Sequence, residues 1–336
     1  MGKSSLRIAA LACLAAASAI PISIAAQQST PAKPLMLITW FGPGGIPLPD
    51  SNNWKAELLT VYDKGTRPVA QFSQAATRRT VSFIVFENLS GTPTAQGCRQ
   101  DAIDPIVKNE GKLISGRVDG EMKNSAGDTL ATTSYVLDLS KEGLPHQPNL
   151  FGFAGNAKTC AEIHISSVVN IPAEQDALKA EVAGFKPDLN YQPGADDYFR
   201  LASALFEGAP GLAAPYYKSS LDALPDDSRN TPLRRIATDQ LVMSLGMSGD
   251  LKNSRAVAEK AVIADPDYPL NYYNLACADA EEGKASDARI HLQQAFDRRA
   301  NVLKGESMPD PAKDDSILKL RKNKAFWAFV LALPKG

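Results

Sequence analysis

The amino-acid sequence predicts an α+β domain, with a mostly antiparallel sheet and a few helices, followed by an all-α domain of helical repeats. Two patterns carry this prediction. From about residue 35 to residue 171, apolar and polar side chains tend to alternate in short runs separated by turn-forming residues, which is typical of strands. After Gly194 the apolar residues recur about every 3.6 positions, which is typical of helices.

The segment 1–25 has the features of a signal peptide. Lys3 and Arg7 precede an apolar stretch from Ile8 to Ile24, and Ser23-Ile24-Ala25 provides the small residues that a signal peptidase accepts. We therefore expect cleavage near Ala25 and a periplasmic or secreted mature protein. The alternative is a retained membrane anchor, although the stretch is short for a span and contains Pro21.

Charge and length limit the classes of protein that fit the mature chain. The sequence has 336 residues, 36 of them basic and 37 acidic, and removal of the signal peptide leaves 34 against 37, a net charge of −3. This balance argues against a nucleic-acid partner, whose phosphates require a basic face. No later apolar run reaches the roughly 20 residues of a transmembrane helix. The length predicts two domains, which we place at residues 26–190 and 191–336.

The first domain contains several candidate strands. Thr80–Phe86 is largely apolar on both alternating faces, so we expect a central strand that is covered on both sides. Trp54–Leu58 and Tyr135–Ser140 alternate as strands with one buried face do. Glu162–Ser166 directs two isoleucines inward and a polar trio outward.

Two helices are expected among these strands. Thr94 caps a helix that carries Cys98 and ends near Pro105, and Pro172 begins a helix that stops at Gly184. This order of elements resembles that of PsbP-like exported domains, which are α/β/α sandwiches. The resemblance covers about 90 residues, rests on element order and transfers no functional residue.

Three cysteines follow the signal peptide, namely Cys98, Cys160 and Cys277. In an oxidising compartment Cys98 and Cys160 could form a disulfide that closes a loop of about 62 residues. The alternative is two separate buried thiols.

A repeat with a period of about 34 residues follows the Pro-, Gly- and Asn-rich segment Lys186–Gly194, which marks the expected domain boundary. Small residues at matching positions allow two helices to approach closely, and a matching glycine allows a left-handed turn between them. The matching pairs are Leu241 with Leu275, Gly249 with Gly283, Ser254 with Ala288, and Ala261 with Ala295.

These positions carry a resemblance to the tetratricopeptide repeat (TPR) family. Two stretches resemble TPRs: Tyr272–Ala278 with Gly283, Ala288, Leu292 and Ala295, and Ser248–Leu251 with Ala261, Asp265 and Pro266. A degenerate copy spans Tyr198 to Pro225, and the tail from Asp310 to Leu333 resembles the helix that closes such arrays. The sequence departs from the family pattern at Ala258, Asp279 and Ala300, and an ordinary helical bundle is the alternative.

The TPR resemblance implies a partner-binding groove lined by the first helix of each hairpin. Its aromatic and acidic side chains suit a peptide with basic and apolar residues, and packing against a neighbouring helix is the alternative role for each of them. The expected groove residues are Phe199, Phe206, Asp239, Met243, Tyr273 and Glu281.

No residue set in the sequence is typical of an enzyme, and we expect neither a cofactor nor a metal. Glu162, His164 and Ser166 alternate on one strand about 7 Å apart, which is too far for hydrogen bonds among them. The cysteines are too widely spaced for zinc, and His291 is expected to face solvent. The basic run Lys319–Lys324 indicates a solvated helix face or, alternatively, a membrane or phosphate contact.

The sequence therefore favours a non-enzymatic exported TPR protein that mediates protein–protein interaction or scaffolding in the cell envelope. The alternative is a small-ligand-binding or hydrolytic α+β domain with the TPR array as a docking arm.

Overall fold

The computed structural model describes residues 33–40, 42–49, 53–63, 66–90, 92–225 and 231–334. The predicted signal peptide and its cleavage near Ala25 lie outside the described residues. From Pro34 onwards the chain forms one compact unit. None of the described helices combines the length and the apolar character that crossing a bilayer requires.

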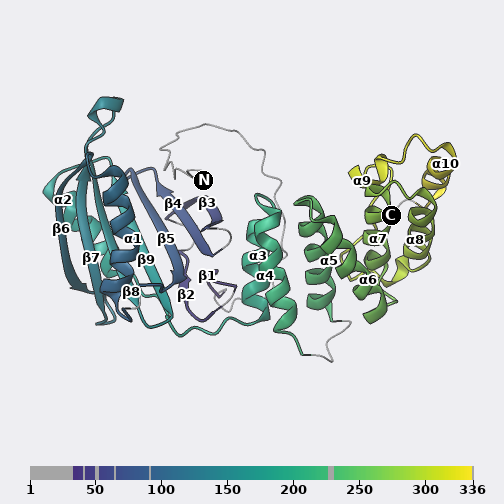
Figure 1. The fold of residues 1–336 in the computed structure, drawn as a ribbon, viewed down its shortest axis with the longest axis horizontal. Helices are drawn as coiled ribbons and strands as arrows, with labels where there is room; N and C mark the ends of the chain where they lie inside the picture. Colours follow the sequence, from purple (N-terminus) through teal and green to yellow (C-terminus); the bar gives the residue numbers. More distant parts are fainter. Residues whose placement is uncertain are drawn as a thin grey trace. The chain divides into compact units, whose positions relative to one another are not determined.

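Seven strands of the described chain form one antiparallel sheet, which confirms the predicted fold class of the first part (Figure 1). The strand order is β3-β4-β5-β9-β8-β7-β6, so β5, which contains the predicted central strand, has a neighbour on each side. The strands are β3 (Lys55–Tyr62), β4 (Arg67–Gln74), β5 (Arg79–Glu87), β6 (Ile114–Lys123), β7 (Thr129–Leu137), β8 (Gln147–Gly155) and β9 (Thr159–Ser167).

Helix α1 (Ala95–Glu110) packs on one face of the sheet. Its buried Cys98 and Ile103 belong to an apolar cluster that includes Phe151 and Phe153 of β8. Cys98 also forms a disulfide with Cys160 of β9, with the two Cα atoms 5.5 Å apart. The candidate disulfide is therefore confirmed, and it attaches the first turn of α1 to the sheet.

The start of α1 follows the sequence prediction, whereas its end does not. The Thr94 side chain accepts a hydrogen bond from the Gly97 amide, so the predicted cap is present. The helix continues through Pro105 to Glu110, beyond the predicted end. Because Pro105 is exposed, water can replace the backbone hydrogen bond that its ring removes.

Helix α2 (Pro172–Ala183) packs on the opposite face and begins at Pro172, as predicted. Its buried Val182 lies so close to Gly152 of β8 that a Cβ at Gly152 would come within 2.6 Å of a Val182 methyl carbon. This position therefore requires glycine. Arg79 of β5 fixes the helix start by donating two hydrogen bonds to the Glu174 carboxylate, at 2.7 and 2.9 Å.

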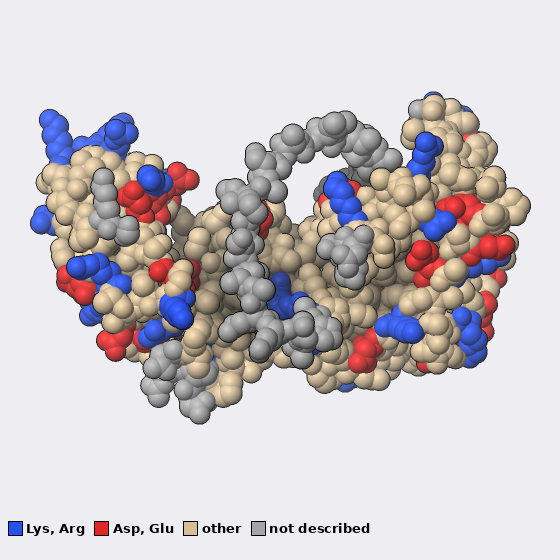
Figure 2. All heavy atoms as spheres, turned by 180° about the vertical axis from the view of Figure 1, so that it is seen from behind, with Lys and Arg blue, Asp and Glu red and all other residues tan. Residues whose placement is uncertain are grey.

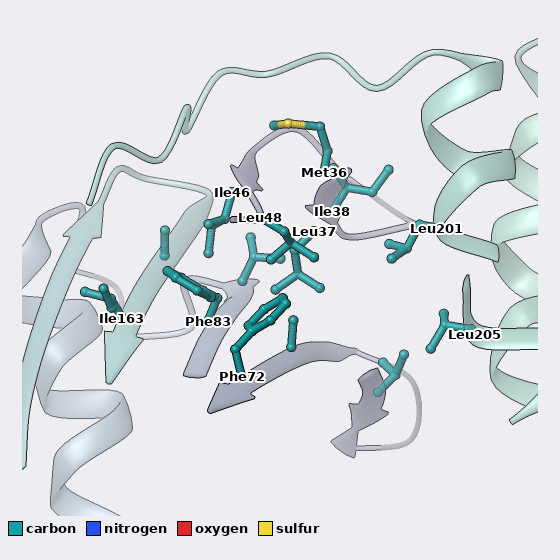
Figure 3. Packing of buried hydrophobic residues seen from close by; sticks show 14 of the residues in the cluster. Met36, Leu37, Ile38, Ile46, Leu48, Phe72, Phe83, Ile163, Leu201 and Leu205 are labelled. Carbon is teal, nitrogen blue, oxygen red and sulfur yellow. The ribbon is translucent and has the colours of Figure 1, made fainter. Parts of the chain in front are cut away.

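A short hairpin, β1 (Met36–Ile38) and β2 (Gly45–Pro47), packs on the same side of the sheet as α2. Figure 3 shows its apolar side chains among Phe72 and Phe83 of the sheet and Leu201 of α3. The Tyr216 hydroxyl of α4 donates to the Ile38 carbonyl at 3.1 Å. The apolar core is therefore continuous across residue 190, where the sequence predicts a domain boundary.

The remaining chain is helical, as predicted, and begins with three antiparallel hairpins in which each helix contacts the next. The hairpins are α3 (Ala195–Phe206) with α4 (Pro210–Asp222), α5 (Pro232–Met247) with α6 (Leu251–Ala264), and α7 (Pro269–Glu281) with α8 (Ala285–Asp297). Two short helices follow, α9 (Asp315–Leu318) and α10 (Lys324–Ala332).

The second and third hairpins match in the predicted repeat register. Gly249 and Gly283 both adopt left-handed backbone conformations, with φ of 86° and 76°, in the turn between their helices. The other three matching pairs are buried in equivalent places. At one of these places the Ser254 hydroxyl donates to the Val242 carbonyl at 2.9 Å, which reflects the close approach of α5 and α6.

Loss of the Cys98–Cys160 disulfide should lower the free energy of unfolding by about 4 kcal/mol, because the bond closes a loop of 62 residues. Urea unfolding of the Cys98→Ala/Cys160→Ala variant measures this loss. The control Cys277→Ser should change the stability by less than about 1 kcal/mol. Three reactive thiols among Cys98, Cys160 and Cys277 in the unfolded, unreduced protein would contradict the disulfide.

Candidate partner-binding surface

One face of α7 contacts a later segment of the same chain. The Tyr273 hydroxyl donates to Asp314 at 3.2 Å, and the Cys277 thiol donates to the same carboxylate at 3.7 Å. One turn further along, Glu281 accepts a hydrogen bond from Ser316 at 2.8 Å and pairs with Lys319. We call the face formed by positions 273, 277 and 281, together with its equivalent on α5, the first-helix face.

Apolar burial holds this later segment in place. Ile317 of α9 is completely buried, and Met308 and Leu320 are nearly so, in a cluster that also contains Tyr273. Burial and the nearby Asp314 raise the pKa of Cys277 well above its usual value. A later segment of the same chain therefore contacts two predicted groove residues, Tyr273 and Glu281.

The equivalent positions on α5, one repeat earlier, are Asp239, Met243 and Met247. Met243 is 38% exposed and Met247 is 62% exposed, whereas Asp239 is half-buried. Met243 and Asp239 are predicted groove residues, whereas Met247 is not among them, although the 34-residue repeat aligns it with the predicted residue Glu281. The first-helix face of α5 thus exposes two adaptable apolar side chains beside a carboxylate.

The predicted groove residues of α3 lie against the second helix of their own hairpin. The Phe199 and Phe206 rings lie 5.8 and 6.2 Å from the Tyr217 ring of α4, and both are half-buried. These contacts fit the packing role that the sequence leaves open for them. Part of each ring is still accessible, so α3 can extend the surface that α5 offers.

Asp239 connects this surface to α7. Its Oδ1 accepts a hydrogen bond from the Asn274 side chain at 2.8 Å. The nearest arginine along the helix, Arg235, is committed to Asp265 through two hydrogen bonds of 2.6 and 3.1 Å. Removal from water raises the pKa of Asp239 to about 6, and the negative charge of Glu306 adds to this rise. Among the described residues no cation pairs with Asp239, so this carboxylate is suited to a basic side chain from outside.

The sequence predicts that His291 faces solvent, but the structure shows that its ring contacts a buried carboxylate. Its Nδ1 lies 2.6 Å from Asp279, which is 1% exposed and also accepts a hydrogen bond from Arg255 at 2.6 Å. Asp279 stands where TPR-like sequences place an aromatic residue. The structure explains this departure, because the carboxylate joins α7 to α6 through an ion pair with Arg255 and to α8 through a hydrogen bond with His291.

The sequence predicts that Glu162, His164 and Ser166 form an exposed polar face. The structure shows that they do not. Glu162 and Ser166 are buried on the sheet face that carries α1. The His164 ring stacks on Phe151 at 4.0 Å, and its Nε2 lies 2.9 Å from the Asn149 side-chain oxygen. No hydrogen bond joins the three within the described chain, so the structure gives them no arrangement suited to nucleophilic catalysis.

Burial shifts the pKa values of two members of this trio in opposite directions. It raises the pKa of Glu162 to about 7 and lowers the pKa of His164 to about 4. At neutral pH the imidazole is therefore uncharged. The Asn149 side-chain nitrogen donates to the Gln147 carbonyl at 2.7 Å, so the Asn149 side-chain oxygen faces His164. Because this oxygen can only accept a hydrogen bond, the proton of the neutral imidazole lies on Nε2.

A cleft of about 580 Å³ lies at the start of α1. Thr94, Gln96 and Asn124 line it together with Asp128 of the β6–β7 turn and Asp188 of the segment before α3. Its size suits a small molecule, although the lining is more polar than that of most ligand pockets. No three metal-ligating side chains of the described residues converge on a possible metal site.

Comparisons with known proteins show limited similarity. No family model matches the chain, and no curated protein sequence matches it. Among solved structures, BtubC from P. vanneervenii is 17% identical over 48% of this chain and 71% of its own, with a TM-score of 0.33. A protein from Bacteroides thetaiotaomicron is 10% identical over 64% and 79%, with a TM-score of 0.30. A multi-domain immunophilin from Arabidopsis thaliana is 10% identical over 74% and 99%, with a TM-score of 0.28. Similarities of this size support no inference about family or function.

Glu162→Gln should make the protein more stable at pH 8 by roughly 1–3 kcal/mol and should not do so at pH 4.5. The folded-state pKa of Glu162 lies at about 7, above its usual value of 4.5, so the stability contributed by the neutral carboxyl is lost as the pH rises through 7. Urea unfolding at both pH values measures the difference. The exposed control Glu87→Gln should show none, and equal effects of the two substitutions would refute a buried, neutral Glu162.

Asp239→Asn should stabilise the protein by roughly 1 kcal/mol at pH 8 relative to pH 4, because the raised pKa of Asp239 makes its charged form unfavourable in the folded state. Thermal unfolding across this pH range, with Asp104→Asn on the exposed side of α1 as control, tests the expectation. A pH profile parallel to that of the wild type would mean that Asp239 is fully solvated.

Proposed function

We propose that this protein is an exported, non-enzymatic adaptor of the TPR type that binds a partner polypeptide on the first-helix face of α5, extended by α3. The observation that carries the proposal is the equivalence of two helices. Positions 273, 277 and 281 of α7 bind a polypeptide segment, residues 314–319 of the same chain. The equivalent positions of α5 carry exposed or half-exposed side chains.

The chemistry of the α5 face supports a particular kind of partner. Met243 and Met247 offer flexible apolar contacts, and Asp239 offers a carboxylate that lacks a cation among the described residues. A helix or extended segment with apolar side chains and one lysine or arginine would complement both. TPR membership, export and a cell-envelope location belong to this proposal, and the repeat register and the sequence of residues 1–25 support them.

A second candidate function is binding of a small ligand by the α+β part. The 580 Å³ cleft at the start of α1 favours it, and its amide, hydroxyl and carboxylate groups suit a polar ligand. The helical hairpins would then serve as a docking arm. This function and partner binding at α5 use different residues, so substitutions on α5 distinguish them.

The test uses the full chain. The first helical hairpin shares an apolar core with the sheet, so removing the helices would destabilise the whole protein. Met243→Lys/Met247→Lys should abolish crosslinking to a partner in cell envelopes, since it removes apolar surface and repels a basic segment. The matched control is Ile263→Lys on α6, where the side chain is 82% exposed outside the first-helix face. Partners that survive the double substitution, or that are lost equally with the control, would rule out this face as the site.

A further inference from the structure

Positive charge is concentrated at the end of the chain. After Asp315 the sequence contains five basic residues and no acidic one, whereas the whole chain has a net charge of −1. The basic residues are Lys319, Arg321, Lys322, Lys324 and Lys335. Figure 2 shows Lys and Arg side chains over the end of the helical part that carries α9 and α10, at the upper left.

Part of this charge has no counter-ion within the described part of the protein. Lys319 pairs with Glu281, and the Arg321 guanidinium lies 5.7 Å from the centre of the Trp327 ring. Lys322 and Lys324 are exposed and form no ion pair with any described residue. Lys322 and Lys324 are thus free to meet an anionic surface.

The solvent-facing side of α10 is apolar instead of polar. Phe326 and Val330 are buried and fix the helix against the third hairpin, and Phe329 lies beside Arg289 of α8. With about 3.6 residues per turn, the opposite side presents a different set of residues. This set is Lys324, Ala325, Trp327, Ala328, Leu331 and Ala332, with Leu331 61% exposed and Trp327 half-exposed.

We propose that this side of α10, with Arg321, Lys322 and Lys324 around its start, docks on the surface of an anionic phospholipid bilayer. Helices that lie in the membrane interface combine an apolar face with flanking Lys and Arg, and a tryptophan suits the depth of the headgroups. The charge complementarity selects phosphate-bearing lipid over a neutral surface. α10 is too short to span a bilayer, so the contact is peripheral.

The test is sedimentation of the full-length mature protein with vesicles of phosphatidylcholine, either alone or mixed with about 30% phosphatidylglycerol. Binding should require phosphatidylglycerol and weaken as salt is raised. Lys322→Glu/Lys324→Glu should weaken it about tenfold or more, and Leu331→Asp should weaken it at both low and high salt. Lys252→Glu/Lys260→Glu on the exposed side of α6 carries the same charge change and should bind as the wild type does.

Three results would each overturn the proposal. They are no binding to anionic vesicles at low salt, equal binding to the two lipid mixtures, and an equal effect of the α10 and α6 lysine pairs. Unchanged circular dichroism and melting temperatures of the variants would show that each comparison concerns folded protein.

Discussion

The structure depends on burying the sheet face that α2 covers only in part. The rest of this face is covered by the β1–β2 hairpin, and α3 and α4 in turn bury the hairpin. The helices are therefore part of the core that stabilises the sheet. Apolar area removed from water is the main source of folding free energy, so this shared cluster couples the first helical hairpin to the sheet, whereas the third hairpin has an apolar cluster of its own.

The helical hairpins use the same surface in two ways. On α7 the first-helix face binds residues 314–319, whereas on α5 Met243 and Met247 of the equivalent face remain exposed and Asp239 hydrogen-bonds Asn274 of α7. Residues 314–319 thereby cover the first-helix face of the third hairpin. The closing segment also brings α9 and α10 into place on the third hairpin.

Much of this architecture follows from local sequence. Alternation predicts the antiparallel sheet, and the spacing of Gly249 and Gly283 predicts the hairpin register, because both depend on residues close in the chain. The shared core does not follow, since it brings Ile38 next to Tyr216, which no local pattern encodes. The same holds for Glu162, whose polar character predicts exposure although α1, from an earlier part of the chain, packs on that face. Of the predicted groove, Met243 remains exposed, whereas Tyr273 contacts Asp314, in a much later segment that periodicity cannot locate.

The environment of Cys277 has a consequence for oxidative folding. A thiol whose pKa is well above its usual value supplies very little thiolate, and thiolate is the species that attacks disulfides. Once α7 and residue 314 have come together, Cys277 is a poor competitor for either sulfur of the Cys98–Cys160 pair. The folded protein therefore keeps Cys277 as a poorly reactive thiol alongside the Cys98–Cys160 disulfide.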